Sequence, residues 1–173
     1  MNHLLITLVG PDATGIVARL AALVEAHGGN WLDSRMIRMG GTFSGLLRVE
    51  LPAAGQAAFA AELAQFMDKA GLRHTLAPAA PEPAAVAAGA SASLELSGQD
   101  HPGIVHAVFA ACQRLGVNVD ELSTGLTIAP WSGTPIFEAK ARLGVPESVL
   151  LAELRASLEA LAADLLVEIH FSH

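Results

Sequence analysis

The sequence of 173 residues contains no tyrosine and a single cysteine, Cys112. One cysteine excludes an intramolecular disulfide and a zinc site built from several cysteines. No apolar run approaches the ~18 residues that a membrane-spanning helix needs. The N-terminal segment also lacks the basic residues of a secretory signal, because residues 1–3 lead directly into the apolar run 4–9. These absences predict a cytoplasmic protein.

Basic residues are scarce. Ten Lys and Arg stand against 17 Asp and Glu, for a formal net charge of −7. The ten are scattered along the chain and form no cluster with interleaved aromatic residues. Neutralising nucleic-acid phosphates requires clustered cations, so direct DNA binding is not expected. Neither a P-loop nor a dinucleotide fingerprint is present, and no cofactor is expected.

Histidines and nucleophiles are present but do not fall into catalytic or metal-binding patterns. His101 and His106 are five residues apart, whereas two ligands on one helix face stand four apart. His170 and His173 fall on a predicted terminal strand and face opposite sides of it. Cys112 belongs to the apolar stripe of a predicted helix, which is typical of a core thiol. We therefore predict no metal site and no catalytic residues.

One segment of the chain occurs twice, 88 residues apart. The first copy reads Gly10-Pro11-Asp12-Ala13-Thr14-Gly15-Ile16-Val17, and the second reads Gly98-Gln99-Asp100-His101-Pro102-Gly103-Ile104-Val105. Asn30 and Asn118 keep the same offset. One long period in so short a chain indicates two copies of one small domain.

Hydrophobic periodicity gives each copy the same order of elements. In the first copy, strands are predicted at 4–9, 30–39, 47–51 and 72–76, and helices at 15–27 and 52–71. The order is β-α-β-β-α-β, which predicts an α+β fold of two ferredoxin-like domains. Each would be a four-stranded antiparallel sheet with two helices on one face. We place the first domain at 1–77, an Ala/Pro-rich linker at 78–92 and the second domain at 93–173.

The repeated turn carries the candidate ligand-binding residues. Asp12 and Asp100 are predicted at or just before a helix N-cap, and Pro102 at the first helical position. Gly15 and Gly103 lack a Cβ, so a ligand can approach the backbone. The carboxylate of a bound amino acid would face the N–H groups of residues 13–15 and 101–103. Its ammonium group would face an Asp, or the side-chain carbonyl of Asn30 or Asn118. The candidate set is Asp12, Ala13, Thr14, Gly15, Asn30, Asp100, His101, Pro102, Gly103 and Asn118.

A purely structural role for the same residues stays open. The aspartates can serve only as helix caps, and the glycines can serve only to let helix and strand pack closely.

With this turn, repeat and element order, the chain resembles a tandem ACT-domain protein. Residues 100–105 match the family's Asp-x-Pro-Gly-hydrophobic turn, whereas the first copy has Thr14 where the family usually has Pro. Two such domains with nothing else attached resemble the glycine cleavage system transcriptional repressor group. Residues 5–17, 28–30 and 33–35 carry that similarity.

The resemblance implies a regulatory function. Proteins of that group are thought to respond to glycine and to act on a LysR-type transcription factor instead of binding DNA. It therefore implies a small amino acid as ligand, a transcription factor as partner and a homodimer. The alternative is a ligand-independent interaction and dimerisation module. ACT domains also accompany catalytic domains, as in folate deformylases, but the chain offers no room for one, so we expect no enzyme.

Overall fold

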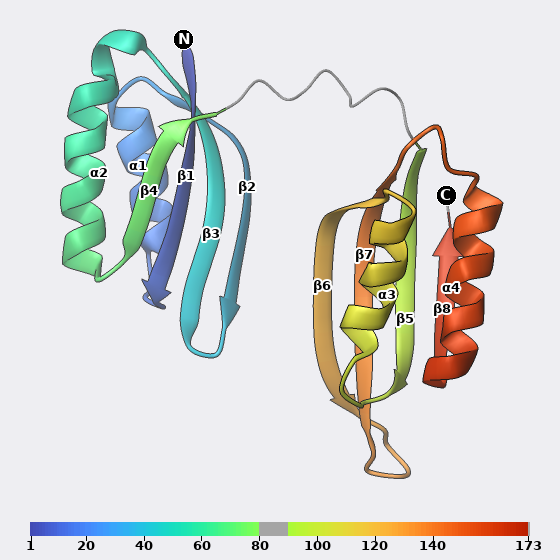
Figure 1. The fold of residues 1–173 in the computed structure, drawn as a ribbon. Coiled ribbons are helices and arrows are strands. Elements are labelled where there is room, and N and C mark those ends of the chain that lie inside the picture. The colour runs from blue at the N-terminus through green and yellow to red at the C-terminus, as the bar shows by residue number, and fades with distance from the viewer. Residues whose placement is uncertain (80–89, 173) are drawn as a thin grey trace. The chain divides into compact units, whose positions relative to one another are not determined.

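Each half of the chain forms a four-stranded antiparallel sheet with two helices (Figure 1). The computed structural model describes residues 1–79 and 90–172. The chain divides into two compact units, Met1–Pro83 and Ala84–His173. We describe each unit by itself.

The first unit follows the predicted element order. It consists of β1 (Asn2–Pro11), α1 (Ile16–Ala26), β2 (Asn30–Met39), β3 (Thr42–Leu51), a 3-10 turn (Ala53–Gly55), α2 (Gln56–Ala70) and β4 (Arg73–Pro78). The strand order in the sheet is β2-β3-β1-β4. The ferredoxin-like α+β prediction is confirmed.

The second unit repeats this plan. It consists of β5 (Ala90–Gln99), α3 (Ile104–Arg114), β6 (Asn118–Ile128), β7 (Pro135–Val145), α4 (Leu151–Leu165) and β8 (Val167–Ser172), with strand order β6-β7-β5-β8. Strand β5 begins at Ala90, three residues before the predicted start of the domain, because residues 90–92 pair with the end of β7 and bury Ala92. Of the predicted linker at 78–92, residues 80–89 lie outside the described residues.

Side-chain periodicity explains how each unit encloses its own core. In the first unit, β1 buries alternate residues, beginning at Leu4, and α1 buries residues four apart: Ile16, Leu20 and Val24. Strand β3 and helix α2 complete this core. The second core is built from the corresponding strands and helices, β5, α3, β7 and α4, and includes Cys112. Burial raises the pKa of the Cys112 thiol, consistent with its predicted place in the core.

Candidate ligand-binding turns

The repeated turn has the same backbone conformation in both units. Gly15 and Gly103 precede helices α1 and α3 with φ of +92° and +101°, in the left-handed region. A Cβ added at either position would meet no atom within 4 Å. The glycine is therefore required by the backbone conformation, while the space beside the turn is open.

The helix caps differ from the prediction. The N-cap residues are Gly15 and Gly103, and no side chain makes a capping hydrogen bond to either helix. Asp12 and Asp100 stand three residues before these caps, and Pro102 also precedes its helix. The first N–H groups of both helices therefore have no side-chain acceptor within the described chain. Together with the positive end of the helix dipole, they offer donors to a small anion.

In the first unit, the turn is joined to the β2–β3 hairpin. The Asp12 Oδ2 lies 3.2 Å from Nε of Arg38, and the Asp12 N–H donates to the Gly41 carbonyl at 3.4 Å. The residue that corresponds to Arg38 in the second unit is Leu126. This ion pair is consequently particular to the first turn.

In the second unit, His101 joins the turn to the end of α4. Its Nε2 lies 3.0 Å from the carbonyl oxygen of Leu165, and its Nδ1 lies 3.1 Å from that of Pro102. Carbonyl oxygens only accept, so both bonds form fully only when both ring nitrogens carry a proton. These two bonds raise the pKa of His101. The corresponding residue in the first unit is Ala13.

The two predicted asparagines lie far from the turn of their own unit. Asn30 pairs with Glu50, beside the Asn2 end of β1, whereas Asp12 follows the opposite end of that strand. Helix α1 separates them by its 11 residues, a length of about 16 Å. A single amino acid cannot bridge the two within one unit. The same arrangement separates Asn118 from Asp100, so the predicted residues form two separate places in each unit.

A feature missed by sequence reasoning surrounds Asn118. Its Nδ2 donates to Oδ1 of Asp120 at 2.7 Å, and both residues line a surface cavity of about 580 Å³ together with Glu147. A β-bulge falls at Asp120, and the carboxylate lies over Gly144, 3.3 Å from where a Cβ would stand. The sequence signal was Gly144, which interrupts an otherwise alternating strand.

Close backbone packing is the alternative role for Gly15 and Gly103, but the structure shows it at two other repeated glycines, Gly10 and Gly98. A Cβ at Gly10 would lie 2.7 Å from the Gly71 carbonyl oxygen, and one at Gly98 would lie 2.6 Å from Cγ1 of Val167. Both glycines let the first strand of the unit approach the residues that lead into, or begin, its last strand.

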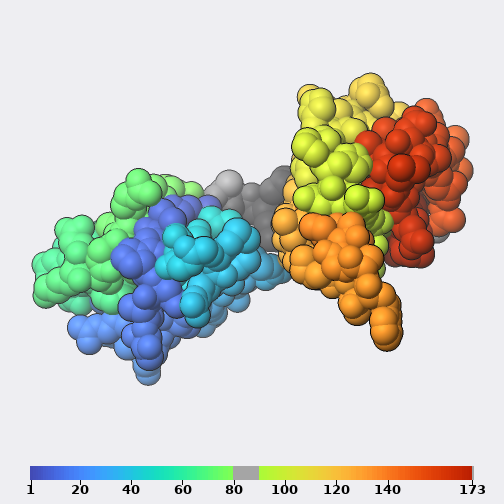
Figure 2. Space-filling model, turned by 90° about the horizontal axis from the view of Figure 1, so that it is seen from below, coloured from blue at the N-terminus to red at the C-terminus, as the bar shows by residue number. Residues whose placement is uncertain are grey.

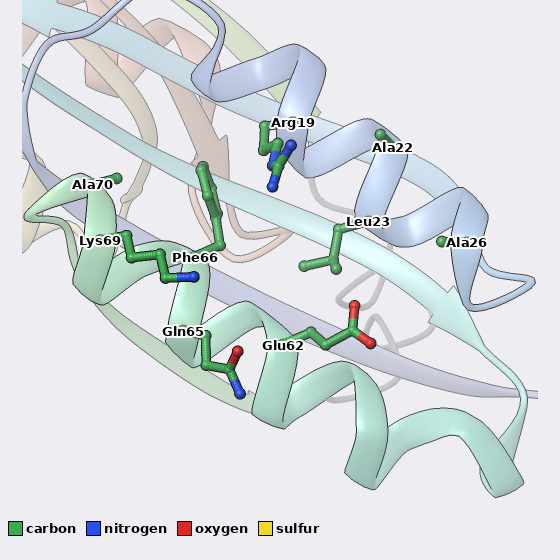
Figure 3. Close-up of a pocket in the computed structure, with 9 residues that line it drawn as sticks. All are labelled: Arg19, Ala22, Leu23, Ala26, Glu62, Gln65, Phe66, Lys69 and Ala70. Atoms are coloured by element: carbon green, nitrogen blue, oxygen red, sulfur yellow. The ribbon is translucent and has the colours of Figure 1, made fainter.

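A groove between α1 and α2 was also absent from the prediction. It has a volume of about 720 Å³ and an apolar floor that includes Leu23 and Phe66 (Figure 3). Arg19, Lys69 and Glu62 lie along its rim. No sequence spacing within one helix reveals it, because its two walls come from helices far apart in the chain.

Two further observations concern other kinds of site. Within residues 1–79 and 90–172, no three His, Cys, Asp or Glu side chains gather closely enough to hold a metal ion. No helix in this part of the chain is long and apolar enough to cross a membrane.

Comparison with known proteins relates this geometry to a family. A model of the ACT domain matches residues 2–76. A solved structure of an unknown protein from Galdieria sulphuraria is 25% identical, with a TM-score of 0.82, and the match covers 99% of this chain and 97% of that one. A candidate glycine cleavage system transcriptional repressor is 21% identical, with a TM-score of 0.70 and coverage of 99% and 96%. None of the curated proteins matches the sequence.

Proposed function

We propose that the chain is a tandem ACT-domain regulator that responds to a small amino acid and acts through protein contact, because a model of the ACT domain matches the first unit and the second unit repeats its fold. ACT domains commonly bind amino acids, and the solved structure described as a candidate repressor has the same fold along its whole length. The proposal gives the protein no enzymatic activity of its own.

The observation that carries the proposal is the repeated open turn. Each turn presents N–H groups without a side-chain cap, at the positive end of a helix and beside open space. An amino acid's carboxylate would accept hydrogen bonds from residues 13–15 or 101–103. Its ammonium group would face Asp12 or Asp100. Asn30 and Asn118 are not part of the same contact within a unit.

The acidic chain favours a protein partner over DNA. A net charge of −7 with cations scattered along the sequence does not favour the neutralisation of nucleic-acid phosphates. We propose glycine as the amino acid and a transcription factor, of the LysR type, as the partner. A ligand acts on such contact only if it binds the two states of the regulator unequally.

Substitution at the turn glycines tests the proposal. We expect an amino acid, glycine first, to raise the thermal unfolding temperature of the full chain in a panel of the twenty amino acids. Gly15→Ala with Gly103→Ala should weaken binding at least about tenfold by calorimetry, because the left-handed backbone would be lost.

Gly133→Ala is the matched control. Gly133 also has a positive φ, +69°, and open space around it, but it lies in the β6–β7 loop. This variant should bind as the parent does. A panel without any shift, followed by calorimetry without heat, would remove the amino-acid part of the proposal.

A second candidate function, a ligand-independent dimerisation module, is favoured by edge strand β6. Its helix-side residues Leu122, Leu126 and Ile128 are 43, 63 and 64% exposed. The strand has an unpaired edge, and the β6–β7 hairpin projects from the second unit (Figure 2). An exposed apolar row beside free backbone groups is typical of a surface that pairs with another chain.

Charge introduced into this row tests for a homodimer. Leu126→Lys with Ile128→Lys should shift a dimer to monomer in sedimentation velocity, because burying two charges without partners is costly. Thr127→Lys, on the opposite face of the same strand, should retain the dimer. A parent chain that sediments as a monomer contradicts this candidate, and so does a dimer that survives the double substitution.

A further inference from the structure

The groove between α1 and α2 combines an apolar floor with charges at separate ends. Leu23 and Phe66 are half-buried and pack on the core, so their outer surfaces remain available. Figure 3 shows Arg19 and Lys69 toward the end of the groove where Phe66 lies, and Glu62 nearer the start of α2. The groove is open along its length, and its volume of about 720 Å³ admits several side chains.

Among residues 1–79 and 90–172, neither cation has an acidic partner. Arg19 and Lys69 are exposed, and no described carboxylate forms an ion pair with either. Glu62, by contrast, lies 3.3 Å from Nε2 of His27. In a chain of net charge −7, one end of this groove is therefore locally positive and uncompensated within the described residues.

The second unit is an internal control for what the fold itself requires. Helices α2 and α4 both have 15 residues and bury equivalent positions, so Lys69 corresponds to Asp164. Arg19 corresponds to Ala107. The same helix pair is thus built without these cations, and their presence in the first unit is not a condition of folding.

The rim of the groove suits a helix. Ala22 and Ala26 stand one turn apart on α1 and are exposed, and small side chains at this spacing let another helix approach closely. A helix lying there would place apolar residues on Leu23 and Phe66. Its acidic residues would face Arg19 and Lys69.

We propose that this groove docks an amphipathic, acidic helix of a protein partner. The inference rests on the proposed function, because it supplies the surface through which that regulator would contact its partner. Apolar contact provides affinity, and the cations select acidic helices over basic ones.

The test uses the full chain and two synthetic peptides of about 18 residues, or roughly five helical turns. Both carry leucines at helical i, i+3, i+4, i+7 spacing. One has glutamates beside this stripe toward one end, and the other has lysines in the same places. We expect the glutamate peptide to bind at least about tenfold more tightly by fluorescence anisotropy, with the preference declining as salt rises. Amide shifts should map to residues 19–26 and 62–70.

Charge reversal in the protein completes the test. Arg19→Glu with Lys69→Glu should invert the preference so that the lysine peptide binds more tightly. Arg114→Glu is the matched control, because Arg114 is exposed in the last turn of α3 just as Lys69 is in the last turn of α2. This control should leave the preference unchanged.

Three results would overturn the inference: equal binding of the two peptides, a preference indifferent to the charge reversal, or shifts outside the groove. If the charge reversal instead turns a peptide-free dimer into a monomer, the occupant is a second copy of this chain. Amino-acid binding is measured on the same variants at residues 101–103, in the other unit. If peptide binding depends on charge but no amino acid binds, only the amino-acid part of the proposed function is refuted. If an amino acid binds but peptide binding does not depend on charge, only the groove proposal is refuted.

Discussion

At the scale of single residues, His101 gives the second turn a dependence on pH that the first turn lacks. Its ring faces two carbonyl oxygens, and the hydrogen bonds to Leu165 and Pro102 raise its pKa above the ordinary value of 6.5. A raised folded-state pKa means that the protonated ring stabilises the fold. That stabilisation is complete below the unfolded pKa and is lost as pH rises through the folded pKa.

We therefore expect the second unit to lose stability as pH rises from the ordinary histidine pKa of 6.5 through the higher pKa of folded His101. Urea unfolding across this range, with NMR titration of the His101 ring, measures the effect. His101→Ala should remove this pH dependence of stability. Alanine is also the residue at the corresponding position 13 of the first unit. His106→Ala, an exposed histidine on α3, should retain it. A pH dependence unchanged in His101→Ala would refute the assignment.

The same scale shows where sequence reasoning about the site succeeded and failed. The repeated glycine was correctly located at a helix start, because its spacing from the strand and the apolar stripe was clear. The aspartates were wrongly expected to cap, because a glycine with positive φ moves the helix start past them. Asn30 was linked to the turn only because Asn30 and Asn118 are separated by the same 88 residues as the two turns. That separation does not say at which end of the intervening helix the asparagine lies.

At the scale of elements, the end of α4 contains a residue in an unfavourable conformation. Leu166 has a φ of +55° and is the only non-glycine residue with positive φ in the described chain. Its side chain is 84% exposed, so it gains little from packing. The corresponding cap of α2 is Gly71, with a φ of +68°.

Leu166→Gly should accordingly stabilise the second unit by about 0.5–1 kcal/mol, since relief of the left-handed strain exceeds the entropy cost of glycine. Thermal unfolding should rise by a few degrees. Ala163→Gly, at an exposed position inside the same helix, should lower stability instead, because glycine in a helix interior costs backbone entropy. A lower unfolding temperature for Leu166→Gly would contradict the strain argument.

Element boundaries were predicted where the sequence has strong local signals. The predicted helix 15–27 and strand 30–39 both end directly before a pair of glycines, and the structure ends α1 at Ala26 and β2 at Met39. Residues 90–92 were misplaced because Ala-Ser-Ala has little strand preference of its own. Pairing with the end of β7 decides their conformation, and that pairing is not visible from the segment itself.

At the scale of the whole molecule, duplication preserved the fold and allowed the surfaces to diverge. The outer face of the second sheet carries the ion pair Lys140–Glu95, at 2.9 Å. The pair Arg142–Glu121 beside it is kept in both units, as Arg48–Asp33 in the first. The corresponding face of the first sheet has Leu46 where the second has Lys140. The groove cations Lys69 and Arg19 of the first unit correspond to Asp164 and Ala107 in the second. Core positions could be predicted from periodicity, but these surfaces depend on which elements lie beside each other.

The carboxylate near Asn118 shows how this divergence constrains the history of the protein. In the first unit, Glu50 pairs with Asn30, and Leu32 lies in the β-bulge of β2. In the second unit, Gly144 stands at the position of Glu50, and Asp120 stands at the position of Leu32. A side chain at Gly144 would press on the Asp120 carboxylate, and a glutamate there would add a second negative charge. The two positions are therefore coupled: where Asp120 is present, glycine at position 144 avoids a close contact with its carboxylate. An exchange between the copies that brought the β3 strand into the second unit without β2 would therefore set a glutamate against the Asp120 carboxylate.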